Sequence, residues 1–404
     1  MTDLLGLVDD LWEGRTDALE VNPMMGRGQI VSLSEGTAFL SWLANICMFA
    51  TADGLVLVDT GNPFSAADTH TMVRSWSSEP LHTAVFSHGH IDHCFGVGPF
   101  EDEHGPVRVI GHEAMPARFD RYTLTAGWNS HINMRQFNVS SGLQWPTVYR
   151  YPDVTYSDSL SIDFGDDRVE LRHARGETDD ATWTWWPARG VLCPGDLIIW
   201  GTPNAGNPQK VQRYPREWAA ALRDMATLDA SVLLPGHGLP VVGAERVRAI
   251  LTDTASYLES LHDQTVELMN TGARLDDIIH TVAPPAALAQ KPYLRPIYDD
   301  PEFIVRNVWR YYGGWFDGNP ASLKPAREAE LAREICSLAG GAGALAERAR
   351  ALIGSDLRLA THLAELAWLA DPATRDVREE VLLARAQAEP SLMAKGIFTS
   401  ASRE

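Results

Sequence analysis

Short apolar runs alternate with amphipathic segments along the first part of the chain. Runs such as 54–58, 83–86 and 231–234 are only four or five residues long, which predicts buried strands. Further along, the apolar positions recur at helical spacing up to the end of the chain. The pattern therefore predicts an α/β domain over residues 1–245 and an all-helical domain over residues 246–404.

Two segments, 113–150 and 203–215, interrupt this pattern. The first is rich in aromatic and polar side chains, and the second is rich in Gly, Pro and Asn. Long irregular segments are commonly lids or walls of binding sites, so we expect both to line a substrate site. Five basic side chains there either bind a sulfate, phosphate or carboxylate group or are solvated surface cations: Arg118, Arg121, Arg135, Lys210 and Arg213.

One predicted strand leads directly into Ser87–Gly98, which reads SHGHIDHCFGVG. Three histidines and one aspartate fall within six positions there: His88, His90, Asp92 and His93. In extended backbone, side chains two residues apart point to the same side, so His88 and His90 can bind one metal ion. Where the chain bends after them, Asp92 and His93 can face a second ion.

Three more predicted strand ends carry metal-binding side chains beside glycine. They are the segment His173–Asp180, Asp196 in Pro-Gly-Asp, and His237 in Pro-Gly-His-Gly. With the cluster they provide seven ligands, the seventh being one residue of the segment 173–180. Seven ligands are enough for two divalent ions with an open coordination position, and such a centre activates water for hydrolysis.

Charge and cysteine usage narrow the class of protein. The net charge of −19 argues against nucleic acid or an anionic membrane surface as a main partner. The four cysteines have no paired spacing, which favours a reducing compartment; we interpret Cys94 as a small buried neighbour of the histidines. The acidic N-terminus lacks the pattern of a signal peptide, and no apolar stretch is long enough to span a bilayer. We expect a cytoplasmic protein with a small-molecule substrate.

The motif SHGHIDH resembles the HxHxDH signature of the metallo-β-lactamase superfamily. VDTG at 58–61, GD at 195–196 and PGHG at 235–238 occur in the order and spacing of that family. The resemblance implies an αββα sandwich of two sheets with helices outside and the metals at one edge. It also implies ligand roles: His88 and His90 bind the first ion, Asp92, His93 and His237 bind the second, Asp196 bridges them, and Asp59 orients a ligand histidine.

One position is similar to the alkylsulfatase branch of this superfamily. Many members have a histidine after the glycine where this chain has Gly176-Glu177, whereas alkylsulfatases have a glutamate. The resemblance thus implies Glu177 as third ligand of the first ion, with His173 as the alternative. Residues 293–325 and 338–378 resemble the alkylsulfatase dimerisation domain, which implies a homodimer formed through the helical domain.

Two departures from the secreted alkylsulfatases shape the functional hypothesis. Those enzymes carry a further sterol-carrier-like domain, which we do not expect here, and they have a second glutamate as bridging ligand. Asp196 instead resembles the bridging residue of thioester- and lactone-cleaving members.

We therefore predict a hydrolase that uses a metal-bound hydroxide to cleave a thioester or ester of a small molecule, including an acyl group on a carrier, with Asp92 and Asp196 as catalytic residues. The alternatives are an alkylsulfatase-type sulfuric ester hydrolase and a metal-binding redox or oxygen-handling protein.

The predicted ligands also restrict the metal. They comprise three carboxylates, four imidazoles and no thiolate. Oxygen-rich ligand sets favour iron or manganese, and imidazole suits zinc and iron. We expect two divalent ions per chain, zinc or iron, with manganese as a further option.

Overall fold

Two β-sheets build the first part of the protein in a computed structural model, which describes residues 3–139 and 141–404. Within the described residues, the first sheet has seven strands in chain order: β1 (Gln29–Ser34), β2 (Thr37–Ser41), β3 (Ile46–Thr51), β4 (Gly54–Val58), β5 (Leu81–Val85), β6 (Arg108–His112) and β7 (Val154–Tyr156). The second sheet has six, in the order β13 (Val241–Val242), β12 (Val232–His237), β11 (Val191–Ile199), β10 (Thr182–Trp186), β9 (Asp167–His173) and β8 (Ser159–Phe164).

The strand directions place several carboxyl ends at one edge of the two sheets. Strands β4, β5, β6 and β7 pair in parallel in the first sheet. In the second sheet β11 pairs in parallel with β12, and β9 runs in the same direction because both are antiparallel to β10. Loops that follow parallel strands leave a sheet at the same edge, so the predicted ligand segments come together there.

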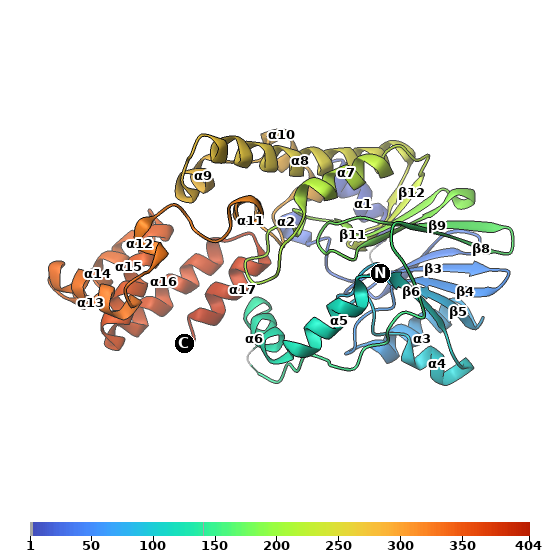
Figure 1. The fold of residues 1–404 in the computed structure, drawn as a ribbon, viewed down its shortest axis with the longest axis horizontal. Coiled ribbons are helices and arrows are strands. Elements are labelled where there is room, and N and C mark those ends of the chain that lie inside the picture. The colour runs from blue at the N-terminus through green and yellow to red at the C-terminus, as the bar shows by residue number, and fades with distance from the viewer. Residues whose placement is uncertain (1–2, 140) are drawn as a thin grey trace. The chain divides into compact units, whose positions relative to one another are not determined.

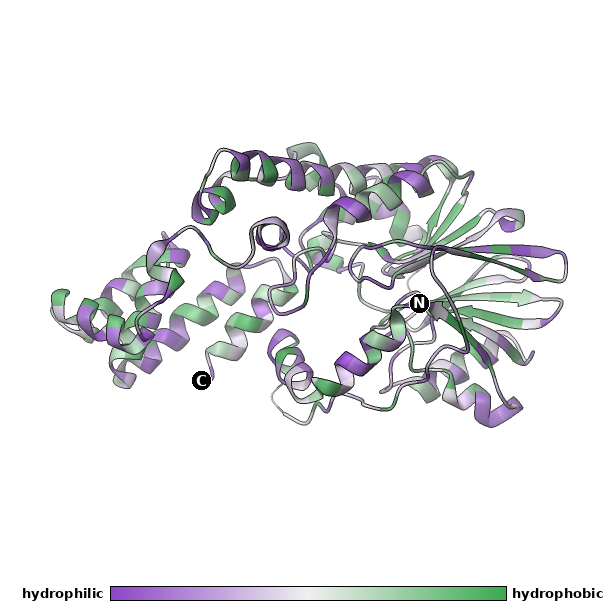
Figure 2. Cartoon of the chain, viewed as in Figure 1, coloured by the Kyte–Doolittle hydropathy of each residue, from purple (hydrophilic) through white to green (hydrophobic). Residues whose placement is uncertain are grey.

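Side chains from both sheets form one shared core. Phe49 of β3 stacks on Trp186 of β10 with ring centroids 4.2 Å apart, and Val56, Val85 and Leu171 belong to the same buried cluster. Figure 2 shows the hydrophobic residues concentrated along these strands. The helices α3 (Ala66–Trp76) and α4 (Gly98–His104) lie outside the first sheet, and α7 (Pro215–Met225) and α8 (Ala244–Asn270) lie outside the second (Figure 1). The predicted αββα sandwich is confirmed.

Several shorter helices occur before the final helices of the chain. The chain opens with α1 (Leu4–Trp12) and α2 (Ala18–Val21). The irregular segment expected at 113–150 instead contains two helices, α5 (Met115–Leu124) and α6 (Ala126–Gln136). Before the final helices lie α10 (Ala286–Ala289) and α11 (Pro301–Gly313).

The C-terminal part is helical, as predicted. Its helices are α9 (Leu275–Thr281), α12 (Pro320–Leu323), α13 (Glu328–Leu338), α14 (Ala342–Leu352), α15 (Leu357–Ala370), α16 (Arg375–Ala388) and α17 (Leu392–Ala401). Ala349, Ala360, Ala364 and Val381 form a buried cluster among α14, α15 and α16, and these small side chains let the helices approach closely. No helix in the described part of the chain combines the length and apolar character that a bilayer span requires.

The chain divides into two compact units. The first comprises Met1–Ala126, Pro146–Thr271 and Thr281–Tyr311, and the second comprises Gly127–Trp145, Gly272–His280 and Tyr312–Glu404. Helix α8 belongs to the first unit and buries residues such as Leu251, Leu258 and Leu261. The compact units therefore do not follow the expected break after residue 245, and a division there into catalytic and dimerisation domains stays a prediction.

Candidate metal centre

The seven predicted metal ligands meet at one edge of the sandwich. They form two groups within the described residues, and in each group the ligand atoms lie within 4.8 Å of one another. One group contains His88, His90, Glu177 and Asp196, and the other contains Asp92, His93 and His237. Four ligands come from the loop after β5 in the first sheet, and three come from the second sheet.

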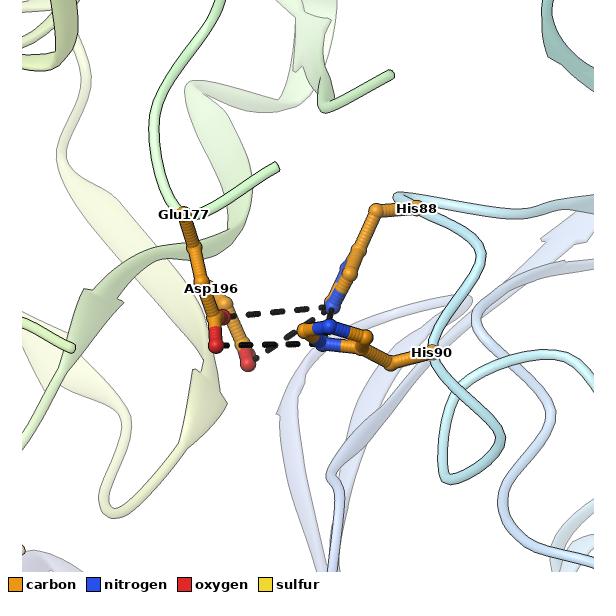
Figure 3. A group of neighbouring side chains, drawn as sticks. All are labelled: His88, His90, Glu177 and Asp196. Atoms are coloured by element: carbon orange, nitrogen blue, oxygen red, sulfur yellow. Dashed lines mark hydrogen bonds and ion pairs between the residues drawn. The ribbon is translucent and has the colours of Figure 1, made fainter. Parts of the chain in front are cut away.

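In the first group, two carboxylates face two imidazoles (Figure 3). Nε2 of His88 and Nδ1 of His90 are 2.7 Å apart. The carboxylate oxygens of Glu177 lie 4.0 Å from the first of these nitrogens and 3.8 Å from the second. Oδ2 of Asp196 lies 3.8 Å from Nε2 of His88. The four side chains thus surround a common point.

Asp196 also faces the second group. Its Oδ1 lies 3.5 Å from Nε2 of His93, and its Oδ2 lies 3.5 Å from Nε2 of His237. Within that group, Oδ2 of Asp92 lies 3.4 Å from Nε2 of His237 and 3.8 Å from Nε2 of His93. Asp196 is therefore positioned between the groups, where a bridging ligand would lie. Gly236 makes room for it, since a Cβ there would come within 2.1 Å of Oδ1 of Asp196.

The arrangement fits divalent metal ions. Nε2 of His93, Oε2 of Glu177 and Oδ1 of Asp196 are buried and have no hydrogen-bond partner among the described residues. Burying such atoms without a partner is costly, and a metal ion would satisfy them. Four imidazoles and three carboxylates are donors that zinc, iron and manganese accept.

Groups behind the ligands hold two histidines in a metal-binding orientation. Asp59 follows β4 and is 2% exposed; its carboxylate accepts hydrogen bonds from Nδ1 of His93 at 2.7 Å and from N and Oγ of Ser87 at 2.7 and 2.8 Å. Nδ1 of His237 donates to the carbonyl of Leu43 at 2.6 Å. With the proton on Nδ1, Nε2 of each histidine is available to a metal. The predicted contact of Asp59 with a histidine of the cluster is present, and its role in orienting a metal ligand stays a prediction.

Glu177 lies in the turn between β9 and β10, where two neighbours bind its carboxylate. Nδ2 of Asn204 donates to Oε1, and Nη2 of Arg213 lies 3.2 Å from the same oxygen. His173 lies outside both groups: its Nδ1 bonds to the carbonyl of Ala181, and its ring stacks on that of His112. The geometry therefore favours Glu177 over His173 as a ligand.

Two of the cations expected to bind a substrate anion are engaged with the protein's own carboxylates. Arg213 pairs with Glu177. Arg118 of α5 pairs with Asp179 and with Asp180, whose Oδ1 lies 2.8 Å from the Nε of the arginine. Oδ2 of Asp180 in turn accepts a hydrogen bond from the backbone N–H of Gly89, between two ligand histidines, at 3.0 Å. These arginines support the metal ligands and do not reach into open space.

Sequence reasoning missed Asn45, a supporting residue of the same site. Asn45 is 1% exposed, and its Nδ2 donates to the carbonyls of Pro235 and Gly238 at 3.0 Å each. Its backbone N–H donates to the carbonyl of Gly236 at 2.8 Å. Asn45 thus holds the backbone before and after His237 by hydrogen bonds. Nothing in the local sequence around Asn45 signals this role.

The carboxylates and imidazoles shift one another's pKa values. Burial lowers the pKa of His237, but Asp196 and Asp92 outweigh it and raise that pKa to about 10. Burial raises the pKa of Asp92, but His93 and His237 outweigh it and lower that pKa to about 2. For His88, burial and the charge of His93 lower the pKa to about 4. In the metal-free protein at neutral pH, His237 is therefore protonated and Asp92 is ionised, so metal binding must displace a proton.

Comparisons with known proteins agree with this geometry. Residues 42–237 match the model of the metallo-beta-lactamase superfamily, and residues 274–404 match the model of alkyl sulfatase dimerisation. A linear primary-alkylsulfatase of Pseudomonas sp. (strain ATCC 19151) is 30% identical over 318 residues, which are 73% of this chain and 60% of that protein. An (R)-specific secondary-alkylsulfatase of Pseudomonas sp. is 28% identical over 377 residues, 83% of this chain and 55% of that protein. The chain thus spans less than two thirds of the length of these relatives.

A solved structure shares the fold. The stereoselective inverting sec-alkylsulfatase Pisa1 from Pseudomonas sp. superposes with a TM-score of 0.83 at 23% sequence identity, covering 93% of this chain and 65% of that one. The arrangement of sheets and helices is therefore that of an alkylsulfatase structure. The chain combines a metallo-β-lactamase domain with an alkyl sulfatase dimerisation domain.

Proposed function

We propose that the protein is a metal-dependent hydrolase of sulfuric esters of alkyl alcohols. In this reaction an alkyl sulfate and water give the alcohol and hydrogen sulfate. The observation that carries this proposal is the extent of the similarity to alkylsulfatases: an alignment over 83% of the chain extends beyond either domain alone. The thioester hypothesis, which rested on Asp196, has no comparable support.

The candidate metal centre suits this reaction. Two divalent ions, for which we propose zinc or iron with manganese as a further option, supply an activated water molecule and stabilise the negative charge that develops on the sulfate. The carboxylate of Asp196 faces His88 of the first ligand group and His93 and His237 of the second. The side chain of Asp92 is 30% exposed, against 2% for His88 and 3% for Glu177. Asp92 is therefore the most exposed of the seven ligands, and as an ionised carboxylate it accepts a proton from water in our proposal.

Lys210 is our candidate for binding the sulfate group. It is half-buried in the loop after β11, and its charge interacts with those of Glu177 and Asp92. Burial and the nearby charge of Arg213 lower the pKa of Lys210 to about 7. A partly desolvated cation beside the metal ligands is suited to an anionic substrate group.

Product analysis tests the proposed reaction. Metal-loaded protein is incubated with linear and secondary alkyl sulfates, and released sulfate is measured; an acyl-thioester panel is followed in parallel with a thiol reagent. We expect sulfate release that the variant Asp196→Asn loses. Thiol release without sulfate release would refute the proposal and restore the thioester hypothesis.

We propose further that the protein is a homodimer assembled through its C-terminal helices. The support is the match of residues 274–404 to alkyl sulfatase dimerisation, together with Leu331 and Leu338 of α13, which are 51% and 81% exposed. Seven residues apart, they share one face of the helix. We expect light scattering after size exclusion to give a dimer, and the double variant Leu331→Asp, Leu338→Asp to give a monomer. The variant Val148→Asp, at a site 85% exposed in the other unit, is the control; a monomeric wild type would refute this proposal.

A further inference from the structure

The two oxygens of the Glu177 carboxylate have different surroundings. Oε1 accepts a hydrogen bond from Nδ2 of Asn204 and lies 3.2 Å from Nη2 of Arg213. Oε2 is buried, has no hydrogen-bond partner among the described residues, and lies 4.0 Å from Nε2 of His88. Asn204 and Arg213 thus hold Oε1, which also lies 3.8 Å from Nδ1 of His90, and Oε2 is left for a metal ion.

Arg213 is committed to this carboxylate. It is 1% exposed, its Nη1 donates to the backbone carbonyl of Glu177, and its Nη2 pairs with the side chain. Within residues 3–139 and 141–404, Glu177 is the one acidic side chain that forms an ion pair with Arg213. A buried guanidinium is tolerated only where a negative charge compensates it.

The function of this pair follows from the net charge that it adds around the first metal ion. A neutral histidine at position 177 would add no charge to the metal centre, whereas the glutamate adds one negative charge. The guanidinium of Arg213 adds one positive charge directly behind that glutamate. The net charge around the first ion is then the same as for a histidine ligand with a neutral residue at position 213.

We propose that Arg213 is the charge partner that allows a carboxylate to serve as third ligand of the first metal ion. Arg213 touches Glu177 and not the reacting atoms, so it is a positioning residue. The inference rests on the metal-dependent function proposed above, and it goes further by making positions 177 and 213 an interdependent pair. A histidine at 177 is compatible with a neutral side chain at 213, and a glutamate at 177 requires the arginine.

A double-mutant cycle tests this dependence. In Glu177→His, Arg213 is buried without its ion-pair partner beside a bound cation, so the zinc affinity of the first position falls about tenfold or more. Adding Arg213→Gln removes the uncompensated charge, so the double variant regains most of that affinity. Competition with a chelator of known affinity measures zinc binding, and elemental analysis measures bound zinc.

Two controls separate charge compensation from a general structural role. Arg118→Gln, at another buried arginine that pairs with Asp179 and Asp180, should not restore zinc binding to Glu177→His. Arg213→Lys in the wild-type background keeps the positive charge. This variant should therefore retain more zinc affinity than Arg213→Gln does. If the double variant binds zinc no better than Glu177→His, or if Arg118→Gln restores binding equally, the inference is wrong.

A single variant covers the case in which Glu177→His does not fold. Arg213→Gln leaves Glu177 without its ion-pair partner in the metal-free protein, whereas a bound ion takes over the neutralisation of the carboxylate. We expect the unfolding temperature to fall more in the metal-free than in the zinc-loaded protein, and equal decreases would overturn the inference. None of these measurements uses turnover, so an absence of sulfatase activity and an absence of coupling between positions 177 and 213 are distinguished.

Discussion

Replacing Asp59 with asparagine tests how the second metal position is organised. Asp59 accepts hydrogen bonds from Nδ1 of His93 at 2.7 Å and from N and Oγ of Ser87 at 2.7 and 2.8 Å. Asparagine has nearly the same size, and it tolerates the positive φ of 63° at this position better than most residues do. We therefore expect the fold to persist while the charge and the hydrogen-bond pattern change.

The expected magnitude follows from the tautomer of His93. The asparagine oxygen can still accept from the N–H of Ser87, which leaves its amide group to donate toward Nδ1 of His93. Nδ1 must then accept, so the proton moves to Nε2, the nitrogen that faces Asp92 and Asp196. Loss of the carboxylate partner of a metal-binding histidine costs about 10- to 100-fold in affinity, or ~1.4–2.8 kcal/mol. We expect that loss at the second position and an intact first position.

Dialysis against a chelator, followed by elemental analysis, measures this effect. At a chelator strength where the wild type keeps two zinc ions, Asp59→Asn should keep about one. Asp163→Asn is the matched control, because that carboxylate lies on the strand β8 with its side chain 68% exposed. If Asp59→Asn retains both ions with wild-type affinity, the carboxylate does not control the tautomer of His93.

The remaining predictions concern the ligand set, pH and substrate binding. Glu177→Ala should lower zinc content and sulfate release together, whereas His173→Ala should leave zinc content unchanged; the opposite outcome in elemental analysis would make His173 the ligand. The pKa of His237 is raised to about 10 in the folded metal-free chain from about 6.5 when unfolded. The protonated histidine therefore stabilises the metal-free fold fully below pH 6.5, and this contribution disappears as the pH rises to 10; a flat unfolding temperature over that range would contradict it. Because the pKa of Lys210 is lowered to about 7, KM for an alkyl sulfate should rise above that pH, and Lys210→Arg should flatten the profile in steady-state kinetics. An unchanged profile in Lys210→Arg would exclude Lys210 as the sulfate-binding group.

Most metal ligands were predictable because they lie at or shortly after a recognisable strand end, whereas Asp196 lies within β11. β5 ends at Val85, shortly before His88, and β12 ends at His237 itself. Parallel strands bring such ends to one edge of a sheet, so local pattern and topology suffice to group them. Only the choice between His173 and Glu177 depended on resemblance, because His173 ends β9 and Glu177 lies in the turn that follows it.

The supporting residues were not predictable in the same way. Asn45 bonds to the backbone at Pro235 and Gly238, 190 and 193 positions away along the chain, and this contact depends on the packing of one sheet on the other. Arg213 looks in the sequence like any cation in a polar loop, since nothing local distinguishes a solvated arginine from one paired with a distant carboxylate.

The helix α6 was missed for a different physical reason. Its buried positions include Asn129, Asn133 and Gln136, so the face that packs inward is largely polar. Helix prediction from sequence depends on an apolar stripe at helical spacing. A helix that buries amides instead lacks that stripe and resembles a loop.

The division of the ligands between the two sheets has a consequence for biosynthesis. Four ligands follow β5 of the first sheet, and Glu177, Asp196 and His237 belong to the second. Neither sheet alone provides a complete set for two ions, so the metals enter after the sheets have packed together. The number of bound metal ions therefore reports whether the two sheets of a chain have packed together.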